Sequence, residues 1–182
     1  MSRVIPEVLM LRHDKRVDQA GWSFPRQIET HLRELTAGRT VLQLFGGRSR
    51  WGVRLDIDPS TSPDVIGDAW LPPFKRDSFD YVIVDPPYEQ ISAPWWCELM
   101  VRAAWIARVA VIWWNTKWFE PLRPMTIERS WLVGLGNYYQ VRCLIVFAVH
   151  EPKRAPGRFF AAGPAVKYNW PLAGQTSLRF GG

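Results

Sequence analysis

The sequence has few cysteines and no long apolar run. Its 182 residues contain only Cys97 and Cys143, which fall in separate predicted elements and have no partner at metal-ligand spacing. We therefore expect two reduced core residues, with no disulfide framework and no metal site. No run of about eighteen apolar residues occurs, and the first residues lack an apolar signal segment. We expect no membrane span and a cytoplasmic location.

Acidic residues are fewer than basic ones. The chain has 23 Lys and Arg against 17 Asp and Glu, a net charge of +6 and an isoelectric point of about 9.7. This balance favours a polyanionic partner such as nucleic acid. Most of the eleven tryptophans are expected to fill the core, and stacking on bases is the alternative for a few of them.

The predicted elements alternate between strands and helices, without an internal repeat. Helical spacing of apolar residues predicts a helix over 24–37, with Ser23 as its capping residue, and a second helix over 95–108. Short β-rich runs predict strands at 40–45, 53–57, 64–68, 79–84, 109–114, 127–135 and 139–149. Most of these strands are apolar and end in Gly, Asp or Pro, which is typical of a parallel sheet covered on both faces.

The fold predicted from this order is an α/β, Rossmann-like sheet, mostly parallel, with a C-terminal antiparallel hairpin. The sheet domain is expected to span 23–150. Residues 1–22 show no clear period and are expected to be an N-terminal extension, and 151–182 an extended C-terminal tail. In such sheets ligands bind at the carboxyl ends of the strands.

Three of the predicted strand ends carry residues suited to holding a nucleoside. Asp56 could accept hydrogen bonds from both ribose hydroxyls, although an aspartate here is also a common turn former. Asp68 could accept a bond from an adenine amine. Gly46 and Gly47 would let the backbone approach a ligand closely.

The fourth strand runs directly into Asp85-Pro86-Pro87-Tyr88. The two prolines fix the backbone, so that the Asp85 carboxylate and the Pro86 carbonyl form a rigid pair of acceptors. Two acceptors match the two hydrogens of an exocyclic NH2 group, and the Tyr88 ring could lie flat against the base that carries it. Acceptors placed where positive charge develops on nitrogen would assist an amine as it attacks an electrophile. The alternative is a strand ended by a rigid loop.

These motifs together resemble a class I S-adenosylmethionine-dependent methyltransferase of the amino-methylating group, over roughly residues 23–150. VLQLFGG resembles the first cofactor motif, LDIDP the ribose-binding strand end, and VDPPY the catalytic motif. GDAWLPPF followed by SFDYVIV resembles the adenine-contacting turn with its strand, and SFPRQIETHL the helix start near the methionine end. The layout is similar to small methyltransferases of bacteriophages and mobile elements.

The resemblance implies S-adenosylmethionine as cofactor and roles for particular residues. The cofactor-binding residues would be Phe24, Pro25, Phe45, Gly46, Gly47, Arg48, Asp56, Asp68, Ala69 and Asp85, and the catalytic ones Asp85, Pro86, Pro87 and Tyr88. The implied reaction is methyl transfer to an exocyclic amine of a nucleobase. Asp at position 85 favours adenine N6 in DNA. The alternatives are guanine N2 or adenine N6 in RNA, and an inactive nucleic-acid-binding relic of the fold.

One segment departs from this family pattern. Only GGRSRWG lies between the first two predicted strands, where the family has a helix and where parallel neighbours normally need about a dozen residues. The link is therefore a bare loop, or the early strands are assigned slightly wrongly. Without the helix, we expect Arg48, Ser49 or Arg50 to contact the cofactor's carboxylate. The alternatives for the two arginines are phosphate contacts or a solvated loop.

Further contacts are expected with a nucleic acid and, through the tail, with another protein. Candidate phosphate contacts are Arg50, Lys117, Arg123 and also Arg102, Arg129, Lys153, Arg154 and Arg158; the alternative for each of them is a solvated surface charge. Gln175–Phe180 resembles the short peptides that dock on bacterial sliding clamps; the alternative is a disordered end. We expect a monomer or a homodimer.

Overall fold

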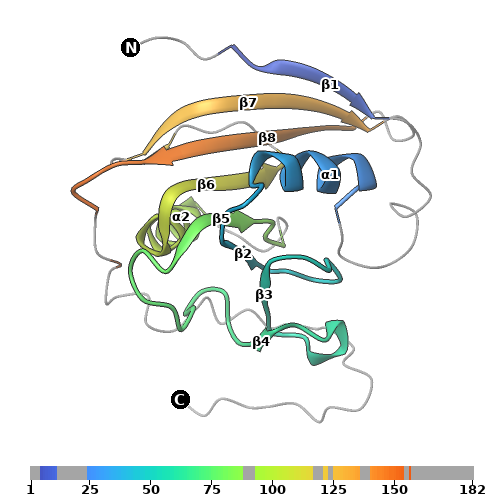
Figure 1. The fold of residues 1–182 in the computed structure, drawn as a ribbon. Helices are drawn as coiled ribbons and strands as arrows, with labels where there is room; N and C mark the ends of the chain where they lie inside the picture. Colours follow the sequence, from blue (N-terminus) through green and yellow to red (C-terminus); the bar gives the residue numbers. More distant parts are fainter. Residues whose placement is uncertain are drawn as a thin grey trace.

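The computed structural model describes residues 5–11, 24–87, 93–116, 121–122, 125–135, 140–153 and 156, without the side chains of 93–95, 135 and 140. These residues form an eight-stranded sheet with one helix on each face (Figure 1). The strands are β1 (Glu7–Leu11), β2 (Val41–Leu44), β3 (Val53–Asp56), β4 (Val65–Ile66), β5 (Phe79–Val84), β6 (Ala107–Asn115), β7 (Met125–Leu135) and β8 (Gln140–Val149). The helices are α1 (Arg26–Leu35) and α2 (Ala93–Ile106), and a 3-10 turn, η1, spans Pro59–Thr61.

The sheet is mostly parallel, as predicted. In the order β1-β7-β8-β6-β5-β2-β3-β4, every pairing is parallel except the two that β8 makes with β6 and β7. The chain moves outward from β2 to β3 and β4, then returns to place β5 on the other side of β2. The strand order therefore reverses between β2 and β5, and this is where open α/β sheets bind their ligands.

Two apolar clusters, one on each face, hold the helices to the sheet. The cluster under α2 includes Leu42, Leu44, Val82, Val84, Leu99, Met100, Ala103, Val111 and Trp113. The cluster under α1 includes Ile28, Leu32, Val41, Ile83, Ile112 and Trp114. Consecutive strand residues alternate between the clusters because side chains of a strand point to opposite faces. Burial of each large aliphatic side chain contributes about 1.5–3 kcal/mol before the entropy of ordering is subtracted.

The link between β2 and β3 is a bare loop. The two strands pair in parallel, with Leu42 opposite Val53 and Leu44 opposite Leu55. Residues 45–52 join them without a helix. The predicted early strands are therefore correctly placed, and the shortened crossover is real.

The predicted helix ends are wrong by a few residues. Helix α1 begins at Arg26 after Pro25 as the N-cap, with no side-chain capping bond, so Ser23 is not the capping residue. Helix α2 ends at Ile106 and passes directly into β6, although we expected it to continue to 108. Ala107 is buried and pairs with Phe79 of β5, so tertiary strand pairing overrides its helical propensity.

Strand β1 was not predicted. Glu7–Leu11 lies in the segment expected to be an extension without period, yet it pairs in parallel with β7 along its whole length. The Trp131 indole of β7 also donates a hydrogen bond to the Glu7 carboxylate at 3.1 Å. Only one of its side chains, Leu11, is buried, so an edge strand of this kind has little apolar periodicity to detect.

Cysteine and tryptophan positions test two expectations from composition. Cys143 is buried, as expected, but Cys97 is exposed on α2, so its predicted place in the core is wrong. Trp70, Trp113, Trp114 and Trp131 are buried, which confirms that these tryptophans serve the core.

In the described part of the chain, no group of His, Cys, Asp and Glu side chains is arranged to hold a metal ion. Neither described helix is long and apolar enough to cross a membrane.

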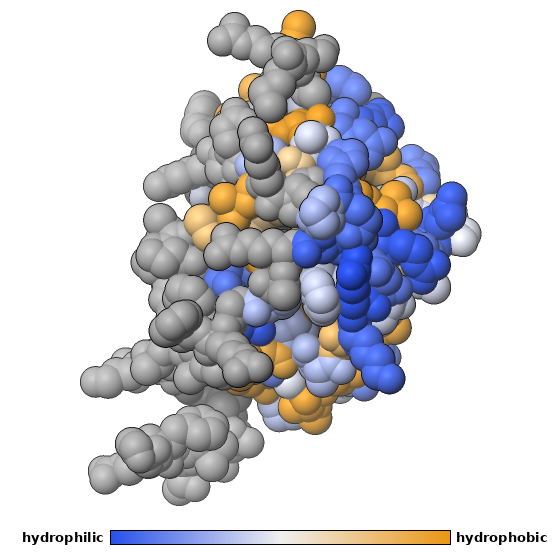
Figure 2. All heavy atoms as spheres, turned by 90° about the vertical axis from the view of Figure 1, so that its left-hand side faces the viewer, coloured by the Kyte–Doolittle hydropathy of each residue, from blue (hydrophilic) through white to orange (hydrophobic). Residues whose placement is uncertain are grey.

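Charged side chains gather at the amino ends of the parallel strands. Seen from that side, hydrophilic residues form a band across the described surface (Figure 2). Lys153, after β8, is buried there and donates to the Asp77 carboxylate and to the Ala107 carbonyl. The hydrogen bond from Lys153 is the main cause that holds the pKa of Asp77 below its ordinary value. Lys153 is therefore not available as the phosphate contact that we expected.

Breaking this ion pair should destabilise the fold. Asp77 has a φ of 57°, which asparagine tolerates, so Asp77→Asn removes the charge without straining the backbone. The buried Lys153 ammonium would then lose its counter-charge but keep an amide oxygen as acceptor. Because the Asp77 side chain is 37% exposed and solvent screens the pair, we expect the free energy of unfolding to fall by about 1–2 kcal/mol. Lys153→Met, which removes the buried charge itself, should cost less. Urea unfolding at neutral pH measures both.

The same pair should make stability depend on acid. Because the folded pKa of Asp77 is lowered, its contribution is present above the unfolded pKa of about 3.9 and is lost as the pH falls through the folded pKa. Lys153→Met should remove part of this acid sensitivity. An unchanged pH profile in that variant would contradict the assignment.

Candidate functional site

Four neighbouring strands end in register at the carboxyl edge of the sheet. Leu44 of β2 pairs with Leu55 of β3 and with Val84 of β5, and Val84 pairs with Trp113 of β6. The next residues along these strands are therefore neighbours at one edge: Asp56, Phe45, Asp85 and Trp114. The backbones of adjacent strands lie about 4.8 Å apart, so the Cα atoms of Asp56 and Asp85, one strand on each side of β2, are about 10 Å apart. Topology thus brings together the acids that the sequence singled out.

The end of β2 approaches β3 very closely. Phe45 has a φ of 60°, a left-handed conformation that is unusual for a bulky residue and that clusters at ligand sites. The Gly46 amide donates to the Leu55 carbonyl at 3.0 Å. A Cβ on Gly46 would lie 2.7 Å from the Arg54 Cβ and 3.2 Å from its Cα, so glycine is required here by space. Gly47, with a φ of 49°, is suited to the turn that follows.

Asp56 organises the loops on both sides of its strand. One carboxylate oxygen accepts from the Gly47 amide at 2.7 Å, and the other accepts from the Asp58 amide at 3.0 Å. Each oxygen has a second lone pair, so the half-buried carboxylate can still accept a ligand hydroxyl. The expected ribose contact and the expected turn role are therefore compatible.

Asp68 lies in the turn after β4, next to buried Ala69 and Trp70. Its carboxylate accepts from the Trp70 amide at 2.8 Å. Burial raises the pKa of Asp68, against the opposing effects of the Trp70 hydrogen bond and of the nearby Arg102 charge. The carboxyl is thus an acceptor in a half-buried setting, as contact with an amine would require.

Arg102 was expected to contact phosphate, and this is wrong. Its guanidinium, on a side chain that is only 11% exposed, forms an ion pair with Glu98 at 2.9 Å, one turn earlier on α2. Arg129, another expected phosphate contact, pairs with Glu7 at 3.5 Å and lies over the Trp131 ring. The i,i+4 spacing of Glu98 and Arg102 was the sequence signal for the first of these pairs.

The Asp85 segment leaves β5 at the point where the strand order reverses. Asp85 and Pro87 are half-buried and Pro86 is buried at the carboxyl edge of the sheet. Tyr88 lies outside the described residues, as do Lys117, Arg123, Arg154, Arg158, the predicted turn Gly136-Asn137 and the tail segment Gln175–Phe180.

The start of α1 also reaches this edge. The Phe24 ring packs edge-on against Trp114, with 6.3 Å between ring centroids. Pro25 is buried and precedes the first turn of the helix. The structure therefore brings Phe24 to the carboxyl end of β6, which is the strand next to β5 and Asp85.

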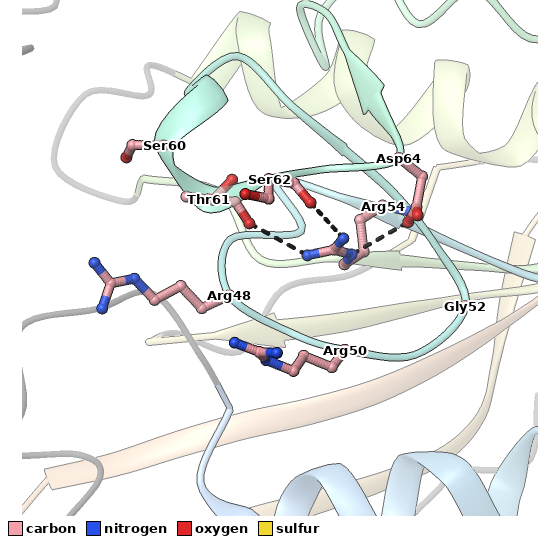
Figure 3. A pocket seen from close by; sticks show the side chains of 8 residues that line it. All are labelled: Arg48, Arg50, Gly52, Arg54, Ser60, Thr61, Ser62 and Asp64. Carbon is pink, nitrogen blue, oxygen red and sulfur yellow. Dashed lines mark hydrogen bonds and ion pairs between the residues drawn. The ribbon is translucent and has the colours of Figure 1, made fainter.

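The three loop residues expected to contact an anion differ in their surroundings. Ser49 is buried, and its hydroxyl has no hydrogen-bond partner among the described residues. Arg48 and Arg50 are exposed and line a separate pocket (Figure 3). A buried serine between two exposed arginines has no signature in a single sequence.

Sequence reasoning missed one apolar residue at the site. Ile57, directly after Asp56, is 49% exposed at the end of β3. An exposed isoleucine beside a nucleoside-binding acid could pack against an apolar face of a ligand. Its place as the last residue of a predicted strand hid this exposure, because the period of a strand does not show where the sheet ends.

The same architecture occurs in solved methyltransferase structures. No protein-family model and no curated protein sequence matches the chain. A putative methyltransferase, yhhF, from Escherichia coli is similar with a TM-score of 0.51 and 16% identity over 69% of this chain and 86% of that one.

Two further likenesses are to structures with bound ligand. The 1,6-didemethyltoxoflavin-N1-methyltransferase of Burkholderia thailandensis, with S-adenosylhomocysteine, gives a TM-score of 0.54 and 11% identity over 69% of this chain and 78% of that one. Magnesium protoporphyrin IX methyltransferase of Synechocystis, with bound SAM, gives a TM-score of 0.52 and 9% identity over 75% of this chain and 89% of that one. At such identities these likenesses establish the fold, which is the Rossmann-like fold of these methyltransferases.

Gly46→Ala should distort the site and destabilise the protein. The new Cβ would clash with the Cβ and Cα atoms of Arg54, so β3 must shift away from β2. We expect the free energy of unfolding to fall by about 1–3 kcal/mol. Gly67→Ala is the matched control, because its Cβ would meet only the Leu55 side chain at an ordinary 3.5 Å. Equal melting temperatures for the two variants would contradict this account of the β2–β3 contact.

Proposed function

We propose that the protein is an S-adenosylmethionine-dependent methyltransferase that acts on an exocyclic amine of a nucleobase, namely adenine N6 in DNA. The observation that carries this proposal is the position of Asp85. Its carboxylate follows β5 at the reversal of strand order and is backed by the buried Pro86. The fold shared with solved methyltransferases supports the reaction class.

The described residues fit the proposed cofactor. Asp56 offers carboxylate lone pairs for ribose hydroxyls, and Asp68 offers an acceptor for the adenine amine. Ile57 supplies an exposed apolar side chain beside them. The loop backbone at Gly46 and Gly47 allows close approach. S-adenosylmethionine, when bound, supplies an electrophilic methyl group on a sulfonium.

Ser49 would provide a hydrogen bond to the cofactor's carboxylate, which the N-terminus of a crossover helix would otherwise contact. Its amide donates to the Gly46 carbonyl at 3.2 Å, which keeps the residue against the end of β2. Its buried hydroxyl has no partner in the described structure. A buried donor without a partner costs stability, so a ligand that supplies an acceptor to this hydroxyl would be favoured. We assign it to the carboxylate of the cofactor.

Asp85 would assist the amine without acting as a strong base. Its carboxylate, with the Pro86 carbonyl, would accept the two N–H bonds of the amine and stabilise the positive charge that develops on nitrogen. The amine proton becomes acidic only as the N–C bond forms, so an ordinary carboxylate suffices to receive it. Prolines at 86 and 87 restrict the backbone, so these acceptors would be positioned before the substrate arrives.

The target base would have to flip out of a duplex, because the half-buried Asp85 carboxylate could not reach the exocyclic amine of a stacked base. DNA adenine is favoured over RNA by the Asp85 motif resemblance. A relic that no longer binds cofactor is disfavoured, because Phe45, Gly46 and Asp56 keep a strained, specific arrangement.

Asp85→Ala should abolish methyl transfer. Loss of the acceptor removes transition-state stabilisation, and we expect the rate to fall by at least about a hundredfold. Asp85→Asn, which keeps one acceptor oxygen, should retain more activity than the alanine variant. Labelled cofactor with separate DNA and RNA pools, followed by mass spectrometry of the nucleosides, measures both the rate and the base. A labelled N6-methyladenine in DNA is the expected product. Undiminished labelling by the alanine variant would refute the role of Asp85.

Ser49→Ala should weaken cofactor binding without weakening the fold. Removing a hydroxyl that has no partner in the described structure leaves the melting temperature of the ligand-free protein equal or higher. Loss of a hydrogen bond to the cofactor should raise its Kd about tenfold, which corresponds to about 1.4 kcal/mol. Calorimetric titration with S-adenosylmethionine gives the Kd.

Ser130→Ala is the control for this variant. Ser130 is also buried, and its hydroxyl has no partner among the described residues, but it lies on β7, away from β2. Its substitution should leave the Kd unchanged. Equal effects of the two substitutions would show that Ser49 has no contact with the cofactor.

A further inference from the structure

A polar pocket lies between the loop that enters β3 and the turn that leaves it. Its volume is about 550 Å³, which is within the range of ligand sites. The lining residues are all polar or glycine: Arg48, Arg50, Gly52, Arg54, Ser60, Thr61, Ser62 and Asp64. A pocket with this lining is unsuited to an apolar ligand and suited to a charged one.

One of the three arginines is fully used in holding the pocket together. The Arg54 guanidinium donates to the Ser62 carbonyl at 2.5 Å and to the Asp64 carboxylate at 3.2 Å. The pKa of Asp64 is lowered, mainly by the hydrogen bond from the Arg54 backbone amide and further by the Arg54 guanidinium. The Asp64 carboxylate therefore stays ionised beside the guanidinium. Arg54 and Asp64 therefore neutralise each other and fix the wall of the pocket.

The other two arginines keep their charge available. Within the described residues, neither Arg48 nor Arg50 makes a hydrogen bond or an ion pair with a carboxylate. Figure 3 shows both side chains extending from the loop toward the same side, while Arg54 turns to the Thr61–Asp64 segment. Because Asp64 pairs with Arg54, no carboxylate among the described lining residues compensates the two other positive charges. Such a site attracts an anion.

The position of the pocket favours an anion other than the cofactor. Gly47 turns toward the Asp56 carboxylate, and Ser49 is buried against the end of β2. Arg48 and Arg50, which alternate with these residues, point instead to the outer side of the loop. The pocket is therefore lined by Arg48, Arg50 and the 60–64 segment, and not by Gly47, Ser49 or Asp56.

We propose that Arg48 and Arg50 bind backbone phosphates of the nucleic-acid substrate in this pocket. The inference rests on the proposed function, since it takes nucleic acid as the substrate. Guanidinium groups bind phosphate oxygens through two parallel N–H bonds, and a rigid wall at Arg54 would keep the loop in place as the strand binds. The bare β2–β3 loop, which replaces a helix, thereby becomes a substrate-binding element.

The test compares two double variants in binding to labelled oligonucleotides without cofactor. Arg48→Ala with Arg50→Ala removes the two pocket charges. Arg39→Ala with Lys75→Ala is the charge-matched control, because both residues are exposed and neither lines the pocket. Fluorescence anisotropy with single-stranded DNA, duplex DNA and RNA of mixed sequence gives the Kd at several salt concentrations. Calorimetry with S-adenosylmethionine is run on the same proteins.

The pocket variant should bind at least one of the oligonucleotides about tenfold more weakly or worse, with a salt slope reduced by about 2, roughly 1 for each lost contact. Its affinity for S-adenosylmethionine should equal that of the unsubstituted protein. A Kd for every oligonucleotide equal to that of the control variant would overturn the proposal. A loss of cofactor affinity instead would also overturn it, since the arginines would then hold the cofactor's carboxylate.

The outcomes separate this site from the proposed reaction. Oligonucleotide binding that depends on Arg48 and Arg50, without methyl transfer by the unsubstituted protein, would support the site and refute the reaction. Methylation of nucleic acid by a protein whose pocket variant binds like the control would support the reaction and refute the site. Lysine in place of both arginines should restore part of the affinity, because it keeps the charge but loses the paired N–H bonds.

Discussion

The hydrogen bond from the Gly47 amide to the Asp56 carboxylate joins the ends of two parallel strands that have no helix between them. Parallel neighbours normally need a long crossover, because the chain must return to the starting end of the sheet. Here residues 45–52 make that return without a helix: the loop starts against β3 at Gly46 and Gly47, and it ends against β2, where the Gln43 side chain donates to the Trp51 carbonyl. Gly46, which has no room for a Cβ next to Arg54, allows the close approach, and Asp56 holds it.

This constraint also explains why the loop has two different surfaces. Ser49 is drawn inward by its bond to the Gly46 carbonyl, while the arginines on either side remain outside. In a helix, neighbouring residues would be distributed around an axis and the helix N-terminus would provide the anion site. In this loop, buried Ser49 instead stands between two exposed arginines. One segment can thus serve the proposed cofactor and the proposed nucleic acid at once.

Much of the fold could be predicted because apolar strands of a parallel sheet carry a strong local signal. The runs TVLQLF and FDYVIV hold the fully buried segments Val41–Leu44 and Val82–Val84, and the structure has strands at both runs, β2 and β5. Strand β1 could not be predicted, since its pairing with β7 leaves most of its side chains exposed. The boundary of α2 was also missed, because the pairing of Ala107 with Phe79 is decided by a strand distant in sequence.

By itself, the sequence determined which residues stand at strand ends, because a run of apolar residues stops where an acid, a glycine or a proline begins. It determined the unusual Asp85-Pro86-Pro87 segment and the shortness of the β2–β3 link in the same way. Only the tertiary structure decided that Asp56, Phe45 and Asp85 are neighbours, that Lys153 and Arg102 are used in ion pairs, and that Arg48 and Arg50 share a pocket. The reason is that register, burial and charge pairing depend on contacts between segments far apart in the chain, and a local pattern does not contain them.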